Sequence, residues 1–250
     1  MPRFEDDAVV LRATEWSESS QIVSLFTRSH GKVRGLAKGA KRLSPSSVQR
    51  FTGGFDLLTI GRVTATTRPS TDLAAITEWD VADTLPHLRR SLVAQRIGCV
   101  AASYVEAMTA DEDAHPALYE ALLALLDSLR EERSDDVAES PALLRFQWAL
   151  LTEVGYQPEL KTDILSGDEL GDANRYTFDP AGGGFSVERQ DERWRVRRET
   201  RELLLDIAAG DRVAATNAAT VARANRLLTS YLREILGREA NTMQLVLRDP

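Results

Sequence analysis

Five short segments of the first eighty residues have the apolar and polar pattern of strands. One of them, residues 20–27, alternates with Ile22, Ser24 and Phe26 on one side of the pleat, and another, residues 7–14, is a β-branched run. Turn-forming runs separate these segments, namely RSHG, RLSPSS and RPST. The segments are residues 7–14, 20–27, 31–38, 55–66 and 73–81. Five short strands in this length are typical of a small closed or partly open barrel, most often an OB-fold. We therefore predict an N-terminal five-stranded OB-fold barrel over residues 1–83.

The apolar spacing changes to a helical period after Thr84. Helices are predicted over residues 85–108, 116–132 and 140–155, and then over about 196–209 and 213–236. Ser140 is the expected N-cap of the third helix, and Gly155 is its expected stop. The fold class is therefore α+β. The predicted parts after the barrel are a helical domain in two pieces, 84–157 and 195–250, and an irregular insertion at 158–194.

Composition narrows the possible functions. The 250-residue chain has a formal net charge of −7 and no apolar run long enough for a membrane span. Its N-terminus has no signal-peptide pattern, so we expect a cytoplasmic protein. Cys99 is the only cysteine and lies in an apolar helical pattern, which favours a buried structural thiol over a nucleophile. The three histidines are far apart, so no metal site, cofactor or catalytic triad is predicted.

One window reverses the acidic balance of the chain. Between Ser19 and Phe55 there are seven Lys or Arg residues and no Asp or Glu. Lys32 and Arg34 are two residues apart on a predicted strand, so their side chains share a face, which continues to Lys38 if the pleat does. We predict a phosphate-binding surface here; a solvated barrel face is the alternative. Its predicted residues are Arg28, Lys32, Arg34, Lys38, Lys41, Arg42 and Arg50.

Trp16 is the candidate aromatic platform of this surface, because proteins that bind single strands stack bases on aromatic side chains. Trp16 lies in a polar turn between two predicted strands, where it is either exposed or caps the barrel. Phe26 alternates with Ile22 and is expected in the core instead. Strong phosphate contact with weak stacking predicts little sequence preference.

Arg145 and Trp148 form a second candidate site, on the predicted helix 140–155. Arg145 lies off the apolar face of this helix, and Trp148 follows it by one turn. An arginine beside aromatic groups can bind a carboxylate and an apolar side chain together, as in an acidic peptide that ends in Phe. The alternative is an ordinary surface arginine.

The run WSESSQIVSLFTRSHGKVRGLAKGAKR, residues 16–42, resembles the N-terminal signature of the RecO family of recombination mediators. The likeness continues through VQRF, LPHLRRSL, ASYVEAM and LLRFQWALLTEVGYQPEL, and it is weaker after residue 160. The resemblance implies an OB domain followed by a helical domain with a small zinc-finger-like insertion. It also implies a non-enzyme that binds single- and double-stranded DNA and anneals complementary strands.

The same resemblance implies the partners. With RecR, family members help to load RecA onto DNA coated by single-stranded DNA-binding protein, SSB. They bind the SSB C-terminal tail on the helical domain, where Arg145 matches a basic position. We therefore expect DNA, RecR, SSB and indirectly RecA as partners, no membrane, and a cytoplasmic, nucleoid-associated location.

The chain departs from the family pattern in its insertion. Many members follow GYxPxL with two CxxC pairs that hold zinc, whereas the segments GYQPELKTDILSGDEL and GGGFSVERQDE contain no cysteine. Zinc in such a site needs four ligands, so we predict a metal-free insertion held by its own side chains. Tyr176, Phe178, Phe185 and Val187 are placed to form its hairpin.

A last basic segment, RWRVRRETR at residues 193–201, surrounds Trp194. It is either a second DNA contact or, as the interleaved glutamates favour, a salt-bridged helix surface. For the whole chain, the alternatives to a mediator are an OB-fold RNA-binding module with a helical interaction domain, and an acidic scaffold whose basic strand binds acidic proteins.

Overall fold

Two compact units make up the chain, and each combines segments that are distant in sequence. The computed structural model describes residues 3–42, 44–52, 54–68, 71–188, 194–210 and 217–248. Residues 1–92 and 102–126 belong to the first unit, and residues 93–101 and 127–250 belong to the second.

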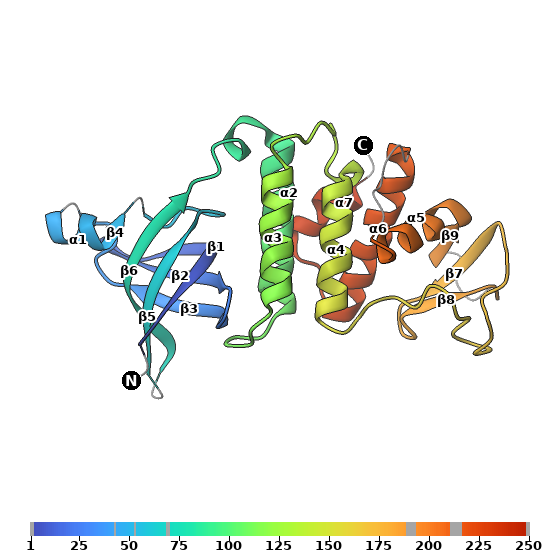
Figure 1. Ribbon diagram of the computed structural model, residues 1–250, viewed down its shortest axis with the longest axis horizontal. Helices are drawn as coiled ribbons and strands as arrows, with labels where there is room; N and C mark the ends of the chain where they lie inside the picture. The colour runs from blue at the N-terminus through green and yellow to red at the C-terminus, as the bar shows by residue number, and fades with distance from the viewer. Residues whose placement is uncertain are drawn as a thin grey trace. The chain divides into compact units, whose positions relative to one another are not determined.

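The first unit contains the predicted barrel (Figure 1). Its five long strands are β1 (Arg3–Ser17), β2 (Ser20–Thr27), β3 (Gly31–Ala37), β5 (Ile60–Arg68) and β6 (Thr71–Asp83). They are ordered β3-β2-β1-β5-β6, and a parallel pairing of β3 with β6 closes the sheet. In sequence, a short helix α1 (Pro45–Arg50) and a short strand β4 (Phe51–Thr52) come between β3 and β5, and neither was predicted. The predicted α+β class with an OB-like barrel is confirmed.

Closure of the barrel depends on a glycine. Gly35 of β3 pairs with Ala74 of β6. A Cβ atom at Gly35 would lie 2.4 Å from Cδ1 of Ile76, which is far inside van der Waals contact. The absence of a side chain therefore lets these two strands approach closely enough to pair.

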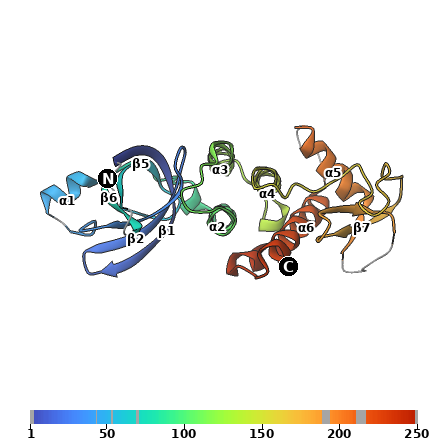
Figure 2. The same cartoon turned by 90° about the horizontal axis from the view of Figure 1, so that it is seen from below.

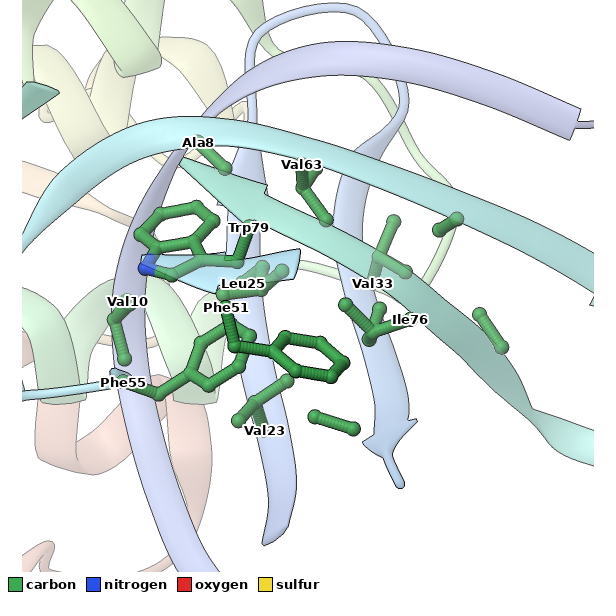
Figure 3. Close-up of a cluster of buried hydrophobic side chains, with 13 residues drawn as sticks. Ala8, Val10, Val23, Leu25, Val33, Phe51, Phe55, Val63, Ile76 and Trp79 are labelled. Carbon is green, nitrogen blue, oxygen red and sulfur yellow. The ribbon is translucent and has the colours of Figure 1, made fainter. Parts of the chain in front are cut away.

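The barrel interior is filled by alternate residues of its strands (Figure 3). Val10, Val23 and Val63 are fully buried, and so is Trp79 of β6. The indole of Trp79 stacks on Phe55 at 5.2 Å between ring centroids, and its Nε1 donates to the carbonyl of Gly54 at 2.9 Å. The buried polar atom of the largest core side chain is thus satisfied.

Two longer helices also contribute to the first unit. They are α3 (Pro116–Ser128) and the C-terminal part of α2 (Leu92–Met108). Tyr119 of α3 packs against Phe26 of β2, with 6.0 Å between the ring centroids. Helix α2 begins seven residues later than predicted, because Leu85 has a positive φ of 46° before Pro86, and a 3₁₀ turn at Leu88–Arg90 precedes the helix.

The second unit is mainly helical. Its helices are α4 (Pro141–Glu153), α5 (Arg198–Ala208), α6 (Ala218–Leu236) and α7 (Gln244–Leu247), with 3₁₀ turns at Val137–Glu139 and Asn241–Met243. The Ser140 hydroxyl accepts a hydrogen bond from the amide of Leu143, which confirms the predicted N-cap. Gly155 and Gly237 follow α4 and α6 with positive φ angles of 79° and 62°. The predicted helix start at 213–216 lies outside the described residues.

The insertion forms a three-stranded sheet of β7 (Arg175–Asp179), β8 (Gly184–Ser186) and β9 (Arg195–Arg197), in the order β8-β7-β9. Phe178 pairs with Phe185 across β7 and β8, and their rings are 5.1 Å apart. Phe178 also contacts Tyr231 of α6 at 5.0 Å. The aromatic residues of the predicted hairpin are therefore buried, whereas Val187 is 48% exposed and lies outside their cluster.

One buried carboxylate connects two distant segments of the insertion. Asp163 is 4% exposed. Its Oδ2 accepts hydrogen bonds from the Ser186 hydroxyl and the Val187 amide, each at 3.0 Å, and its Oδ1 accepts from the Leu165 amide at 2.9 Å. Burial would raise the pKa of Asp163, but the hydrogen bonds from Val187, Leu165 and Ser186 outweigh it and hold the pKa below its ordinary value.

Candidate nucleic-acid interface

Lys32, the centre of the predicted basic surface, is buried. Lys32 is 8% exposed, and its Nζ donates to the carbonyls of Glu106 at 2.9 Å and Thr109 at 2.7 Å. It also lies 3.3 Å from a carboxylate oxygen of Asp111. Helix α2 ends at Met108, so Lys32 satisfies carbonyls that have no partner within the helix and faces the negative end of its dipole.

The prediction of Lys32 as a phosphate contact is therefore corrected. Alternation placed Lys32 and Arg34 on the same face of β3, and both side chains do line one hollow on the outside of the barrel. The end of α2 covers Lys32 there and leaves Arg34 exposed. The ammonium of Lys32 is engaged in holding β3 to α2.

Two exposed arginines flank Ser24 on this outer face. The strand register pairs Arg12 with Ser24 and Ser24 with Arg34, so the three side chains form one row across β1, β2 and β3. The Ser24 hydroxyl donates to Glu106 at 2.5 Å. Within the described part of the chain, neither Arg12 nor Arg34 has a carboxylate partner. Sequence reasoning missed Arg12, because only the register of β1 with β2 brings it beside Arg34.

The other predicted cations of this segment lie in the turn after β3. Strand β3 ends at Ala37, so Lys38 does not continue its pleat. The Lys41 amide donates to the Ser19 carbonyl at 3.1 Å, which ties this turn to the turn between β1 and β2. The Lys41 ammonium forms an ion pair with Glu15 and lowers the pKa of that carboxyl. Lys38 and Arg42 are exposed without a carboxylate partner among the described residues.

Trp16 lies on β1 next to these turns, and its side chain is 64% exposed. This excludes a barrel-capping role, because the indole that fills the barrel is that of Trp79. An exposed indole has the chemistry of a stacking platform for bases. We call Arg12, Arg34, Lys38 and Arg42 the barrel cations, and Trp16 lies on the same strand as the first of them.

Two predicted cations lie apart from this group. Arg28 forms an ion pair with Glu120 of α3 at 2.7 Å and lies over the Tyr119 ring at 5.5 Å. Arg50 lies on α1, donates to the Ser46 carbonyl at 3.2 Å, and lines a different hollow. The carboxylates of that hollow are those of Glu5, Glu78 and Asp80. The structure therefore does not bring all seven predicted cations together.

The predicted pair on α4 is also divided. Arg145 is exposed, as expected, and has no carboxylate partner in the described ranges. Trp148 is only 7% exposed, because it belongs to the core of the second unit. The prediction that Trp148 offers a contact surface to a partner is therefore wrong. Cys99 is half-buried in α2, and burial raises the pKa of its thiol, which suits an unreactive residue.

Comparisons with known proteins match both parts of the chain to one family. Residues 1–85 match the N-terminal model of recombination protein O, and residues 89–244 match its C-terminal model. The chain belongs to the RecO family. Membership of this family places the chain in DNA repair and recombination.

Individual relatives show how far the likeness extends. A DNA repair protein RecO of Myxococcus xanthus is 29% identical over 253 residues, which cover 98% of each chain. The RecO of Anaeromyxobacter sp. strain Fw109-5 is 31% identical over 73% of this chain and 68% of its own. The RecO of Geobacter sulfurreducens is 33% identical over 66% of this chain and 63% of its own.

The zinc that the family pattern implies does not fit the residues of this insertion. The described residues contain no group of three or more His, Cys, Asp or Glu side chains that could hold a metal. Asp163, the buried acid of the first cysteine-free segment, already accepts hydrogen bonds from Ser186 and Val187 of the second.

No helix in the described ranges is long and apolar enough to cross a membrane.

Proposed function

We propose that this chain is a recombination mediator that binds single- and double-stranded DNA through the outer face of its barrel. The observation that supports this most directly is the barrel cations, which are exposed and have no carboxylate partners among the described residues. Phosphate contacts by such side chains release counterions from the nucleic acid, which gives affinity without sequence preference. Family membership supports DNA as the polyanion.

The proposed mechanism is annealing without any bond being made or broken. The barrel cations hold one strand by its phosphates, while its bases stay free to pair. A second strand that is delivered to the same protein meets the first at a high local concentration. No catalytic residue and no cofactor take part in this mechanism. With RecR, the chain then helps to load RecA onto SSB-coated DNA.

The proposed contact with SSB is Arg145 on α4. Its exposed guanidinium suits the carboxylates of an acidic tail. Because Trp148 is buried, the apolar part of the tail must pack on another side chain. Substitution Arg145→Glu is expected to weaken annealing of SSB-coated strands while annealing of bare strands stays unchanged.

Annealing of complementary oligonucleotides, bare and SSB-coated, tests the proposal. The variant R12Q/R34Q/K38Q/R42Q should anneal the bare strands and the SSB-coated strands poorly. Its salt slope for a single strand should fall by about 2.8, at roughly 0.7 for each lost phosphate contact. Arg62→Gln is the matched control, because Arg62 is exposed on the barrel but paired with Glu5 and Asp7. An unchanged slope in the fourfold variant contradicts the barrel site, and stronger binding of RNA than DNA favours an RNA-binding module.

A further inference from the structure

Five arginines line a hollow in the second unit that the proposed barrel site does not use. Arg195 and Arg197 come from β9, and Arg223, Arg226 and Arg233 come from α6; Figure 2 shows α6 beside α5 and β7. The hollow encloses about 700 Å³, and its only acidic lining residues in the described part of the chain are Asp179 and Glu234. We call it the arginine groove.

The arginine groove revises the reading of the segment 193–201. The expected salt-bridged surface holds for Arg198, which pairs with Glu202 at 2.8 Å and with Asp172 at 3.4 Å. Arg197, its neighbour in sequence, lines the groove instead and has no carboxylate partner among the described residues. Arg193 lies outside those residues. Adjacent arginines of one segment therefore have opposite electrostatic surroundings.

Arg226 lies 4.0 Å from a carboxylate oxygen of Asp136, and Arg233 lies 3.5 Å from one of Glu239, so the poorly compensated charge of the groove is that of Arg197 and Arg223. The Arg223 guanidinium donates to the hydroxyls of Thr220 at 2.7 Å and Thr200 at 3.5 Å, which carry no charge. Burial and the positive charge of Arg197 lower the pKa of Arg223, and Glu199 only partly opposes them. A bound anion between Arg197 and Arg223 would relieve this repulsion.

The shape of the groove indicates which anion fits. Arg223, Arg226 and Arg233 follow one stripe of α6 over ten residues, about 15 Å at 1.5 Å per residue. Arg195 and Arg197 line it from β9. Cations from two elements along such a stripe suit a ligand with a charge on every unit, which a nucleic-acid strand has and a mixed acidic peptide does not.

An aromatic side chain completes the site. Trp194 lines the groove, is half-buried, and lies 5.8 Å from Phe178 between ring centroids. An indole held by a buried phenyl ring beside arginines is the combination on which single-stranded bases stack.

We propose that the arginine groove binds a second segment of single-stranded nucleic acid, with phosphates on its arginines and a base on Trp194. The inference rests on the proposed function, because it assigns a second strand site to the same chain. A chain with two such sites holds two strands at once.

Stoichiometry of a short fluorescent oligodeoxythymidine tests this in the full-length protein. The wild type is expected to bind two strands, and R197Q/R223Q and R12Q/R34Q/K38Q/R42Q one each. Combining the six substitutions should abolish binding. The salt slope of the groove site should fall by about 0.7 in Arg197→Gln, which removes one phosphate contact and leaves the site occupied. Arg198→Gln is the matched control and should change neither value.

Cross-linking locates the strand independently. A 5-iododeoxyuridine oligonucleotide should cross-link to the peptide that contains Trp194, and R197Q/R223Q should lose this product while circular dichroism shows a folded chain. R197Q alone changes an exposed side chain, and it should already reduce the yield of this cross-linked product.

The outcomes separate the two proposals. If R197Q/R223Q keeps both strands and the barrel variant loses one or both, the groove inference is overturned and the barrel site stands. If only R197Q/R223Q loses a strand, the barrel site fails. If no oligonucleotide cross-links at Trp194 but an acidic peptide ending in Phe does, the groove binds a protein instead, and the inference is overturned.

Discussion

In the first unit the ammonium of Lys32 connects strand β3 to the carbonyl end of α2, whereas in the second unit the carboxylate of Asp163 connects two segments of the insertion through their amides and a hydroxyl. The charges are opposite, and so are the backbone groups that satisfy them. Both are buried, and both link segments more than twenty residues apart. In each unit a buried charged residue has a structural role.

Lys32 and Asp163 differ in the kind of segment to which each belongs. Lys32 sits within a basic segment and removes one cation from its surface. Asp163 sits in a cysteine-free segment and links it to Ser186 and Val187 of the second such segment. Charge in the sequence therefore overstated the exposed basic surface of the barrel, because one of its cations is buried.

The largest expected effect is at Asp163. Asp163→Ala leaves the amides of Leu165 and Val187 and the Ser186 hydroxyl without their acceptor, which should destabilise the insertion by roughly 3 kcal/mol. Hydrogen exchange of the Val187 amide measures this directly, because that amide should become unprotected. Asp168→Ala is the control, since Asp168 is exposed in the same loop. Retained protection in Asp163→Ala would mean that the aromatic cluster alone holds the insertion.

Loss of Lys32 should cost less, because Asp111 is partly solvated. Lys32→Met keeps the apolar stem but leaves the carbonyls of Glu106 and Thr109 without a donor, so we expect a loss of roughly 2 kcal/mol in the free energy of unfolding. Urea denaturation measures it, with Lys38→Met as an exposed control that should lose almost nothing. Equal stability of the two variants would contradict the helix-capping role of Lys32.

Lowering the pH should distinguish the stabilisation by Asp163 from that by Lys32. The folded pKa of Asp163 is below its ordinary value, so its stabilisation is complete above about pH 4 and disappears as the pH falls through the folded pKa. Asp163→Asn, which does not ionise, should remove this part of the acid dependence in urea melts. Its stability at neutral pH should lie between wild type and Asp163→Ala. If Asp163→Asn loses stability at low pH as the wild type does, the pH dependence of the unfolding free energy comes from other carboxyl groups.

The smallest expected effect is that of a chelator. Because the insertion is held by Asp163 and its aromatic cluster, EDTA should leave the melting temperature and the Val187 protection unchanged. A relative with both cysteine pairs is the comparison in which zinc removal should unfold the insertion. A fall in the melting temperature of this chain would show a metal that its side chains do not suggest.

Local patterns predicted the elements of this fold well. Strand-like apolar patterns separated by turn residues identified the five barrel strands, because each strand has one face in the core, occupied by residues such as Val23 and Val63. Ser140 and Gly237 mark helix ends through backbone chemistry that is local to them. The short elements α1 and β4 were missed, since β4 is ordered by pairing with the distant strand β6.

The candidate site was less predictable, because its geometry depends on residues far apart in sequence. Lys32 meets the end of α2 more than seventy residues later, and no local pattern shows that contact. Arg12 joins Arg34 only through the strand register. The arginine groove forms only when β9 and α6 come together.

The salt dependence of oligonucleotide binding by Arg34→Gln and Lys32→Met tests the central claim most directly, because these two cations lie on the same face of one strand. At a temperature where circular dichroism shows both variants folded, the slope should fall by about 0.7 in Arg34→Gln and stay at the wild-type value in Lys32→Met. A fall in Lys32→Met as large as that in Arg34→Gln would contradict the account, since it would place the buried ammonium on the phosphate backbone.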